Sequence, residues 1–145
     1  ISVLISTLSL SNILSANSGA VATAWPKSGI DMYCGIGGAP QGVLAAASLA
    51  CFGGQMQGRL VARDASDKKK IMDAGIEDPK QKFSITGMAS GDITFAATGV
   101  TSGALLSGIQ KIGDIAVTQS LVVRSKTGTL RYVDGYHQFG LAGST

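Results

Sequence analysis

Residues 35–40, with the sequence Gly-Ile-Gly-Gly-Ala-Pro, form the part of the chain whose spacing most favours chemistry. They follow an apolar run at 30–34 and precede an apolar helical pattern at 43–50. A glycine turn that opens a helix exposes backbone amides at the positive end of that helix, which is where phosphate groups bind. Proline suits the first helical turn, because its missing N–H has no partner there anyway. We therefore predict that residues 31–42, DMYCGIGGAPQG, form a phosphate-facing loop and helix start.

This glycine segment departs from the two common nucleotide-binding motifs. Pro40 stands where the dinucleotide fingerprint G-x-G-x-x-G has its last glycine, and no Gly-Lys-Ser/Thr of a P-loop follows. Glycines can also serve only to make a tight turn. From the residues alone, phosphate binding and a purely structural turn both stay open.

Other reactive side chains give little support for catalysis by this chain alone. His137 is the single histidine, and no G-x-S-x-G elbow surrounds a serine, which disfavours a Ser-His-Asp hydrolase and favours a structural histidine. The nine carboxylates form no cluster of the kind that a metal-assisted phosphatase needs, and most lie at turns or helix caps. Cys34 and Cys51 lack zinc-binding spacing and are interpreted as thiols of a reducing compartment, which predicts a cytoplasmic location. A disulfide between them stays open from the sequence, although a chain of this size does not need one.

Composition argues against several classes of protein. Hydrophobic residues make up 45% of the chain and charged residues 14%, which is typical of a folded domain and not of a disordered one. The basic residues are scattered apart from the lysine run 68–70, and no aromatic residues alternate with them, which argues against nucleic-acid binding. The apolar residues 1–14 fall short of the about twenty that a membrane span needs. Because the chain begins with Ile1, we expect it to be a piece of a longer protein.

Hydrophobic periodicity and turn residues predict alternating strands and helices, followed by a hairpin. Two stretches share the order strand, glycine turn, helix. In chain order, the expected elements are a helix at 20–25 stopped by Pro26, a strand at 30–34, a helix from Pro40 that ends at Gly53, a strand at 59–63, a helix at 66–74 capped by Asp64 or Ser66, a strand at 93–98, a helix at 103–110, and a hairpin within 114–133 that turns at 126–128.

Four blocks of sequence resemble the C-terminal half of class II fructose-1,6-bisphosphatases, and the resemblance extends over residues 21–137. The blocks are DMYCGIGGAPQGVLAAASLACFGGQMQGRLVAR, DAGIEDP, DITFAATGVTSGALLSGI and TQSLVVRSKTGTLRYVDGYH. The resemblance implies an α/β fold, the second half of the layered α-β-α-β-α fold of sugar phosphatases, with a mixed sheet, flanking helices and a C-terminal β-hairpin. It divides the chain into a divergent segment at 1–20, an α/β domain at 21–137 and a tail at 138–145.

The same resemblance implies metal-dependent hydrolysis. The substrate would be fructose 1,6-bisphosphate, converted to fructose 6-phosphate and phosphate with Mg²⁺ or Mn²⁺ in gluconeogenesis and glycerol metabolism. Some members of the family also accept sedoheptulose 1,7-bisphosphate. The parent enzyme is expected to be a cytoplasmic homo-oligomer without nucleic-acid or membrane partners.

Only a few site residues are carried over by the resemblance. Gly38 matches the family glycine whose backbone approaches the substrate, with Gly37 and Ala39 beside it. Gln41 stands at the glutamate of the family motif G-G-A-P-E-G, a metal ligand, but a neutral amide lacks the charge of that carboxylate. The aspartate-glycine-aspartate motif of the family is missing from residues 1–20, and most of its metal-binding acids belong to the half that is not here.

Two hypotheses remain for this chain. It is either the C-terminal part of a fructose-bisphosphatase, inactive on its own, or a non-catalytic module for phospho-sugar binding or oligomerisation. Part of a layered fold would also expose apolar surface, so self-association is expected.

Overall fold

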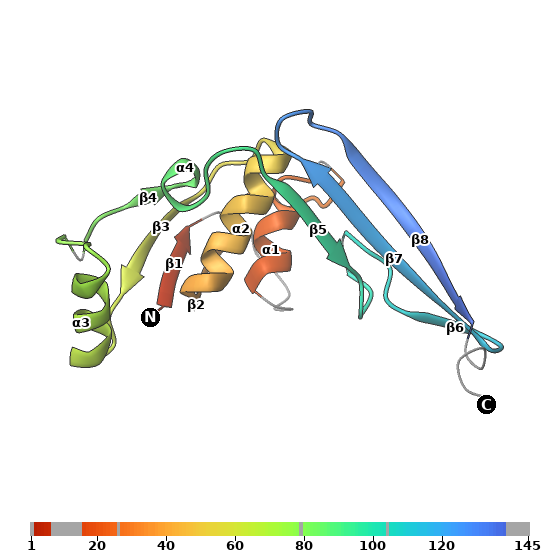
Figure 1. Ribbon diagram of the computed structural model, residues 1–145, viewed down its shortest axis with the longest axis horizontal. Helices are drawn as coiled ribbons and strands as arrows, with labels where there is room; N and C mark the ends of the chain where they lie inside the picture. Colours follow the sequence, from red (N-terminus) through yellow and green to blue (C-terminus); the bar gives the residue numbers. More distant parts are fainter. Residues whose placement is uncertain (1, 7–15, 26, 79, 104, 139–145) are drawn as a thin grey trace.

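The computed structural model describes residues 2–6, 16–25, 27–78, 80–103 and 105–138 (Figure 1). Residues 7–15 of the predicted divergent segment and 139–145 of the predicted tail lie outside this set. Within the described residues, no helix combines the length and the apolar character that crossing a bilayer requires. The helices and strands are, in chain order, β1 (Ser2–Ser6), α1 (Ala16–Ala22), β2 (Cys34–Gly38), α2 (Ala39–Phe52), β3 (Gln57–Val61), α3 (Ala65–Asp73), β4 (Phe83–Ser84), α4 (Ile85–Met88), β5 (Thr94–Thr98), β6 (Gln110–Ile112), β7 (Ile115–Arg124) and β8 (Leu130–Gln138).

Two sheets lie along the molecule (Figure 1). Sheet A has the order β2-β1-β3-β4, and sheet B has β5 and β6 on one side of β7 and β8 on its other side. Both β2 and β3 are antiparallel to β1, so they run in the same direction, and α2 connects them. The α/β class and the C-terminal hairpin are confirmed. Every ladder between described strands is antiparallel, however, whereas a mixed sheet was expected.

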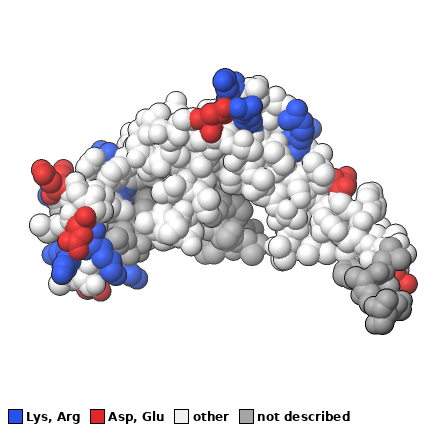
Figure 2. Space-filling view, viewed as in Figure 1, with Lys and Arg blue, Asp and Glu red and all other residues white. Residues whose placement is uncertain are grey.

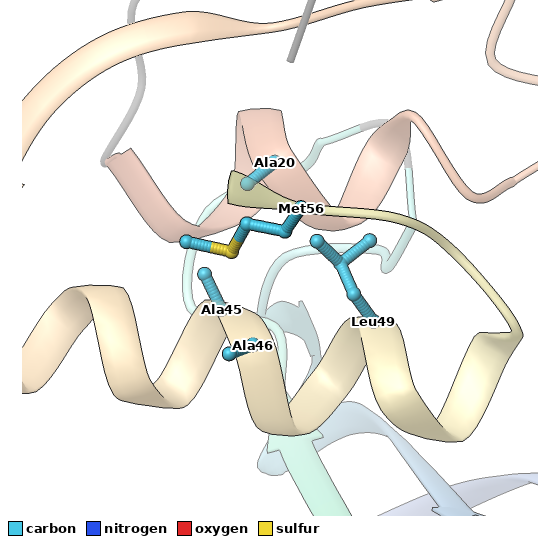
Figure 3. Packing of buried hydrophobic residues seen from close by; sticks show 5 residues of the cluster. All are labelled: Ala20, Ala45, Ala46, Leu49 and Met56. Carbon is cyan, nitrogen blue, oxygen red and sulfur yellow. The ribbon is translucent and has the colours of Figure 1, made fainter. Parts of the chain in front are cut away.

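Helix α2 organises the core. Its alanine-rich sequence favours a helix, Pro40 lies in its first turn, and Gly53 ends it with a left-handed φ of 74°. Small side chains at the contact let α1 approach α2 closely. The buried residues of this cluster come from α1, α2 and the residue before β3, and they are Ala20, Ala45, Ala46, Leu49 and Met56 (Figure 3).

A second cluster attaches sheet B to the end of α2. Cys51 of α2 packs with two residues of β7, Leu121 and Val123, which are 1% and 2% exposed. Trp25 lies edge-on to Tyr132 of β8, with ring centroids 6.2 Å apart. One end of sheet B is therefore held against the helices, whereas the other end, with β6, extends away from them (Figure 1).

Several predicted elements are confirmed with shifted bounds. The helix expected at 66–74 is α3, and Asp64 is its N-cap residue. The strands expected at 59–63 and 93–98 are β3 and β5. The hairpin turns where it was expected, and Gly128 supplies its positive φ of 59°.

Two helix predictions were wrong. The helix expected at 20–25 begins at Ala16 and ends at Ala22, and Pro26, which was expected to stop it, lies outside the described residues. The helix expected at 103–110 is not formed, because the described residues of that stretch make bends and then enter β6. The backbone of this stretch forms hydrogen bonds across a loop instead, since the Ile109 N–H donates to the Val100 carbonyl at 3.1 Å. The short elements β4, α4 and β6 were not predicted.

Candidate functional site

The glycine segment 35–40 lies in strand β2 and in the first turn of α2, not in a loop. β2 pairs antiparallel with β1, so that Gly35 lies opposite Ile5. The prediction of a phosphate-facing loop over these glycines was therefore wrong, because a loop would leave open the backbone groups that take part in a ladder here. The part that stays available to a ligand is the junction at Gly38, where the strand ends and the helix begins.

Tyr33 gives a structural reason for two glycines around this segment. Its ring lies between Gly19 of α1 and Gly35 of β2. A Cβ atom would come within 2.7 Å of the ring Cε2 at Gly19 and within 2.6 Å of the Oη at Gly35, closer than real Cβ atoms approach. These glycines therefore make room for the aromatic ring between α1 and β2. Sequence reasoning missed this role of Tyr33, because it depends on a contact between α1 and β2.

The start of α2 is an open helix N-terminus. Gly38 is its N-cap residue, with extended backbone (φ −66°, ψ 154°), and no side chain caps the helix by a hydrogen bond. Pro40 has no N–H, so the amides of Ala39 and Gln41 are the donors of the first turn that lack a partner within the helix. The first turn also carries no acidic residue. Amides of this kind, at the positive end of a helix, attract anions.

The start of α3, in contrast to that of α2, is capped by a side chain. The Oδ1 of Asp64 accepts a hydrogen bond from the Asp67 N–H at 2.8 Å. The carboxylate of Asp67, which is itself buried, accepts hydrogen bonds from the backbone N–H and the Nε of Arg63 at 3.3 and 3.2 Å. These hydrogen bonds lower the pKa of Asp67 to about 2. The α3 terminus is thus served by carboxylates of its own chain, whereas the first turn of α2 has no acid of its own. Acidic and basic side chains also gather at the α3 end of the face that Figure 2 shows.

The side chain of Gln41 folds back over Gly38. Gln41 is the third residue of α2, and its Oε1 stands where a Cβ atom of Gly38 would be. Since the φ of Gly38 is open to any residue, this glycine is needed for space and not for conformation. The structure therefore brings Gly38, Ala39 and the exposed Gln41 together, with Gly37 one residue back in β2.

The described residues do not form a metal centre by themselves. They contain no group of three or more His, Cys, Asp or Glu side chains that could hold an ion. Gln41 can offer one neutral oxygen, whereas Mg²⁺ and Mn²⁺ prefer carboxylates. Gln41, where a metal ligand was expected, lies at the start of α2. The described residues do not supply the negative charge that a divalent cation needs there.

Other residues singled out from the sequence lie away from the start of α2. Asp31, three residues before the start of β2, lines an open hollow of about 680 Å³ together with Gln55 and Thr86. His137 lies on β8, where its Nε2 is 3.0 Å from the Oγ1 of Thr118. Asp31 and the start of α2 thus lie beyond opposite ends of β2, so only the second half of the segment 31–42 lies at the helix start.

Two groups with shifted pKa values belong to the packing of sheet B. Burial raises the pKa of the Cys51 thiol, which donates a hydrogen bond to the Ile93 carbonyl at 3.5 Å. A hydrogen-bonded ion pair with Asp92 raises the pKa of Arg124. No disulfide forms among the described residues, and Cys34 is exposed on β2.

Comparison with known proteins identifies the family. The model for the family "Bacterial fructose-1,6-bisphosphatase, glpX-encoded" matches residues 16–137. A protein from Trichodesmium erythraeum (strain IMS101), named D-fructose 1,6-bisphosphatase class 2/sedoheptulose 1,7-bisphosphatase, is 38% identical over 136 residues, which cover 85% of this chain and 39% of the relative. A protein of the same name from Synechococcus sp. (strain JA-2-3B'a(2-13)) is 36% identical over 133 residues, which cover 83% of this chain and 38% of the relative.

The chain thus spans well under half the length of the curated relatives that it matches. The family match nevertheless covers most of the chain and includes the whole junction of β2 and α2. The resemblance seen in the four sequence blocks is confirmed, and the chain belongs to the family of glpX-encoded bacterial fructose-1,6-bisphosphatases.

Proposed function

We propose that this chain is the part of a metal-dependent fructose-1,6-bisphosphatase that binds a phosphate group of the substrate. The complete protein would convert fructose 1,6-bisphosphate to fructose 6-phosphate and phosphate in gluconeogenesis, in the cytoplasm, and would also accept sedoheptulose 1,7-bisphosphate. The open start of α2 at Gly38 is the observation that carries this proposal. The names of the relatives support the class of substrate.

The backbone at the start of α2 would bind the phosphate. The amides of Ala39 and Gln41 would donate hydrogen bonds to phosphate oxygens, and hydrogen bonds to a charged acceptor are stronger than neutral ones. A helix of 14 residues places its full positive end at this point, and no acid in the first turn repels the ligand. A side chain at position 38 would compete with Gln41 for space, so Gly38 keeps the approach open.

A divalent cation, Mg²⁺ or Mn²⁺, polarises the phosphoryl group in phosphate-ester hydrolysis of this kind. Its charged ligands would come from outside the described residues, because Gln41 offers a neutral oxygen only. We therefore assign substrate binding to this chain and leave the hydrolytic step to the complete protein.

The neutral side chain of Gln41 supports a second candidate, a non-catalytic module that binds phosphorylated sugars. The Nε2–H of an amide can donate to a phosphate oxygen, whereas a glutamate at the same place would repel that oxygen unless a cation lay between them. Gln41 thus favours direct phosphate binding over ion binding. The two candidates share the binding step and differ in whether hydrolysis follows.

Amide-resolved NMR titration tests the shared binding step. We expect fructose 1,6-bisphosphate to shift the resonances of the Ala39 and Gln41 amides, and inorganic phosphate to shift them less. The Asp67 amide is the internal control, because Asp64 already accepts its hydrogen bond. Equal shifts at the starts of α2 and α3, or none at either, would contradict the proposal.

Phosphate release separates the two candidates. With Mn²⁺ present, we expect the chain alone to release no phosphate above a no-protein control. In a complete protein that carries this sequence, Gln41→Glu should raise turnover if the chain belongs to an enzyme, and the exposed Gln55→Glu is the matched control. Unchanged turnover together with weaker binding would favour the non-catalytic module.

A further inference from the structure

Strand β2 leads into α2 without a loop between them, so the position of the strand decides where the first amides of the helix lie. Three of its five residues are glycines. Glycine weakens a strand, because it offers no side chain to pack and leaves many backbone conformations open. β2 also lies at an edge of sheet A, with β1 as its neighbour among the described strands. Packing from outside the strand is therefore needed to hold β2 in place.

The ring of Tyr33, the residue before β2, supplies such packing. Alternate residues of a strand share a face, so Gly35 and Gly37 lie on one face of β2 and neither offers a side chain there. The ring lies over Gly35, with its Cε1 and Cζ atoms each 2.8 Å from where a Cβ atom of that residue would be. The other edge of the ring, at Cδ2 and Cε2, faces Gly19 of α1. One side chain thus joins β2 to α1.

Tyr33 also connects β2 with the core around α2. It packs against the buried cluster that includes Ala20 of α1 and Leu49 of α2. Ala39, the first residue of α2, packs against the same cluster, so the residues on either side of β2 are held by one apolar region. Ile36, on the other face of the strand, is 65% exposed and contributes little burial. Tyr33 is therefore the main side-chain anchor of β2 on the side of the helices.

We propose that Tyr33 is a positioning residue, whose ring holds β2 so that the amides of Ala39 and Gln41 are ordered before a phosphate group arrives. This inference rests on the proposed function. A donor that is already ordered adds no entropic cost on binding, whereas a mobile donor must be ordered by the ligand, which weakens affinity. Without the ring, the glycine-rich strand and the helix start that follows it would become more mobile.

Replacement of the ring tests the proposal. In Tyr33→Leu, we expect lower NMR order parameters for the Ala39 and Gln41 amides than in the wild type. Affinity for fructose 1,6-bisphosphate should fall roughly tenfold, since ordering the backbone of one residue is worth about that factor. Tyr33→Phe should behave as the wild type does, because the ring atoms beside both glycines remain.

Gly19→Ala displaces the ring without removing it. Alanine favours a helix over glycine, so this substitution should strengthen α1 itself. Its Cβ atom would come within 2.7 Å of the Tyr33 ring, however, so amide order and affinity should still fall. In the Tyr33→Leu background, which lacks the ring atoms that clash, Gly19→Ala should cost no further affinity. Additive losses would show that the two residues do not act through one contact, and would overturn the proposal.

The control for general destabilisation is Leu49→Ala. Leu49 belongs to the same cluster and is fully buried, but it lies near the other end of α2. This variant should lose stability while the Ala39 and Gln41 amides stay ordered and affinity is kept. Unchanged amide order in Tyr33→Leu, or equal losses of order and affinity in Leu49→Ala, would overturn the proposal. Order parameters are measured without ligand, so they decide the role of Tyr33 even if the wild-type chain binds no fructose 1,6-bisphosphate, a result that would contradict the proposed function instead.

Discussion

Two stretches of the sequence share the order strand, glycines, helix, but only one of them folds that way. The first gives β2 and then α2 directly. The second gives β5, and then a loop over 99–109 that leads into β6. In the first stretch the glycines end a strand next to a helix, and in the second they let two parts of one loop touch. Glycine content alone therefore does not distinguish a helix start from a closed loop.

The loop over 99–109 is held by backbone contacts that only glycine permits. A Cβ atom at Gly99 would overlap the carbonyl oxygen of Ser107, and one at Gly108 would lie 2.6 Å from the Ser102 nitrogen. The Ser107 N–H donates to the Gln119 Oε1 of β7 at 3.0 Å, so the strand also fixes the loop. α2, in contrast, depends on a proline in its first turn, a glycine after its last turn and an apolar face. One stretch is thus stabilised by side-chain burial and the other by close backbone packing.

Leu49→Ala should have the largest effect on stability, because it tests the side-chain burial that holds α2. Leu49 is fully buried between α1 and α2 (Figure 3), and a truncation there leaves a cavity. We expect a loss of about 2–5 kcal/mol in the free energy of unfolding, measured by urea denaturation. Leu44→Ala on the same helix is the control, since Leu44 is 52% exposed and should lose far less. Equal losses would mean that burial does not hold this helix.

Gly99→Ala should have the next largest effect, because it tests the backbone packing of the loop. The added methyl group would meet a carbonyl oxygen that cannot move without moving the loop. We expect a loss of about 1–3 kcal/mol, as for other overpacked sites. Gly103→Ala lies in the same loop with no atom within 4 Å of its Cβ position, and it should change stability little. The comparison fails if both substitutions cost the same.

Local signals made part of this fold predictable. Pro40 and Gly53 mark α2, Asp64 marks the start of α3, and Gly128 marks the hairpin turn, and each acts on its own neighbours in the chain. Gly38 and Gln41 were found by resemblance to a motif, and the structure brings them together.

Contacts between distant residues were not predictable from one sequence. β2 was misread as a loop because its glycines give no strand signal, and its identity depends on pairing with β1, nearly thirty residues earlier in the chain. The loop over 99–109 depends in the same way on the bond from Ser107 to Gln119 of β7. Residue spacing in the sequence carries no trace of either contact.

A smaller effect, visible only in acid, tests the contrast between the two helix starts. Hydrogen bonds from Arg63 lower the pKa of Asp67 from 3.8 to about 2, so its carboxylate stabilises the folded chain above pH 4. This contribution should be lost as the pH falls through about 2, because the folded state then binds the proton as well. We expect the free energy of unfolding of the wild type to fall more steeply between pH 4 and pH 2 than that of Asp67→Asn. Parallel curves for the two proteins would show that this carboxylate does not support the α3 start.

Gly38→Ala should change stability least, and it tests most directly whether this glycine serves binding, unlike Gly99, which serves packing. Its Cβ position is taken by the far end of the Gln41 side chain, which is exposed and can rotate away, whereas Gly99 faces backbone. We therefore expect a change within about 0.5 kcal/mol, together with a several-fold loss of affinity for fructose 1,6-bisphosphate in the NMR titration. Gly38→Ala combined with Gln41→Ala separates the causes when it is compared with Gln41→Ala alone. Equal affinity of these two variants would mean that Gly38→Ala acts only through the displaced Gln41, and a lower affinity of the double variant would mean that the methyl group itself obstructs the phosphate. A stability loss as large as that of Gly99→Ala would instead place Gly38 among the glycines that serve packing, and the start of α2 would lose its best support as a binding site.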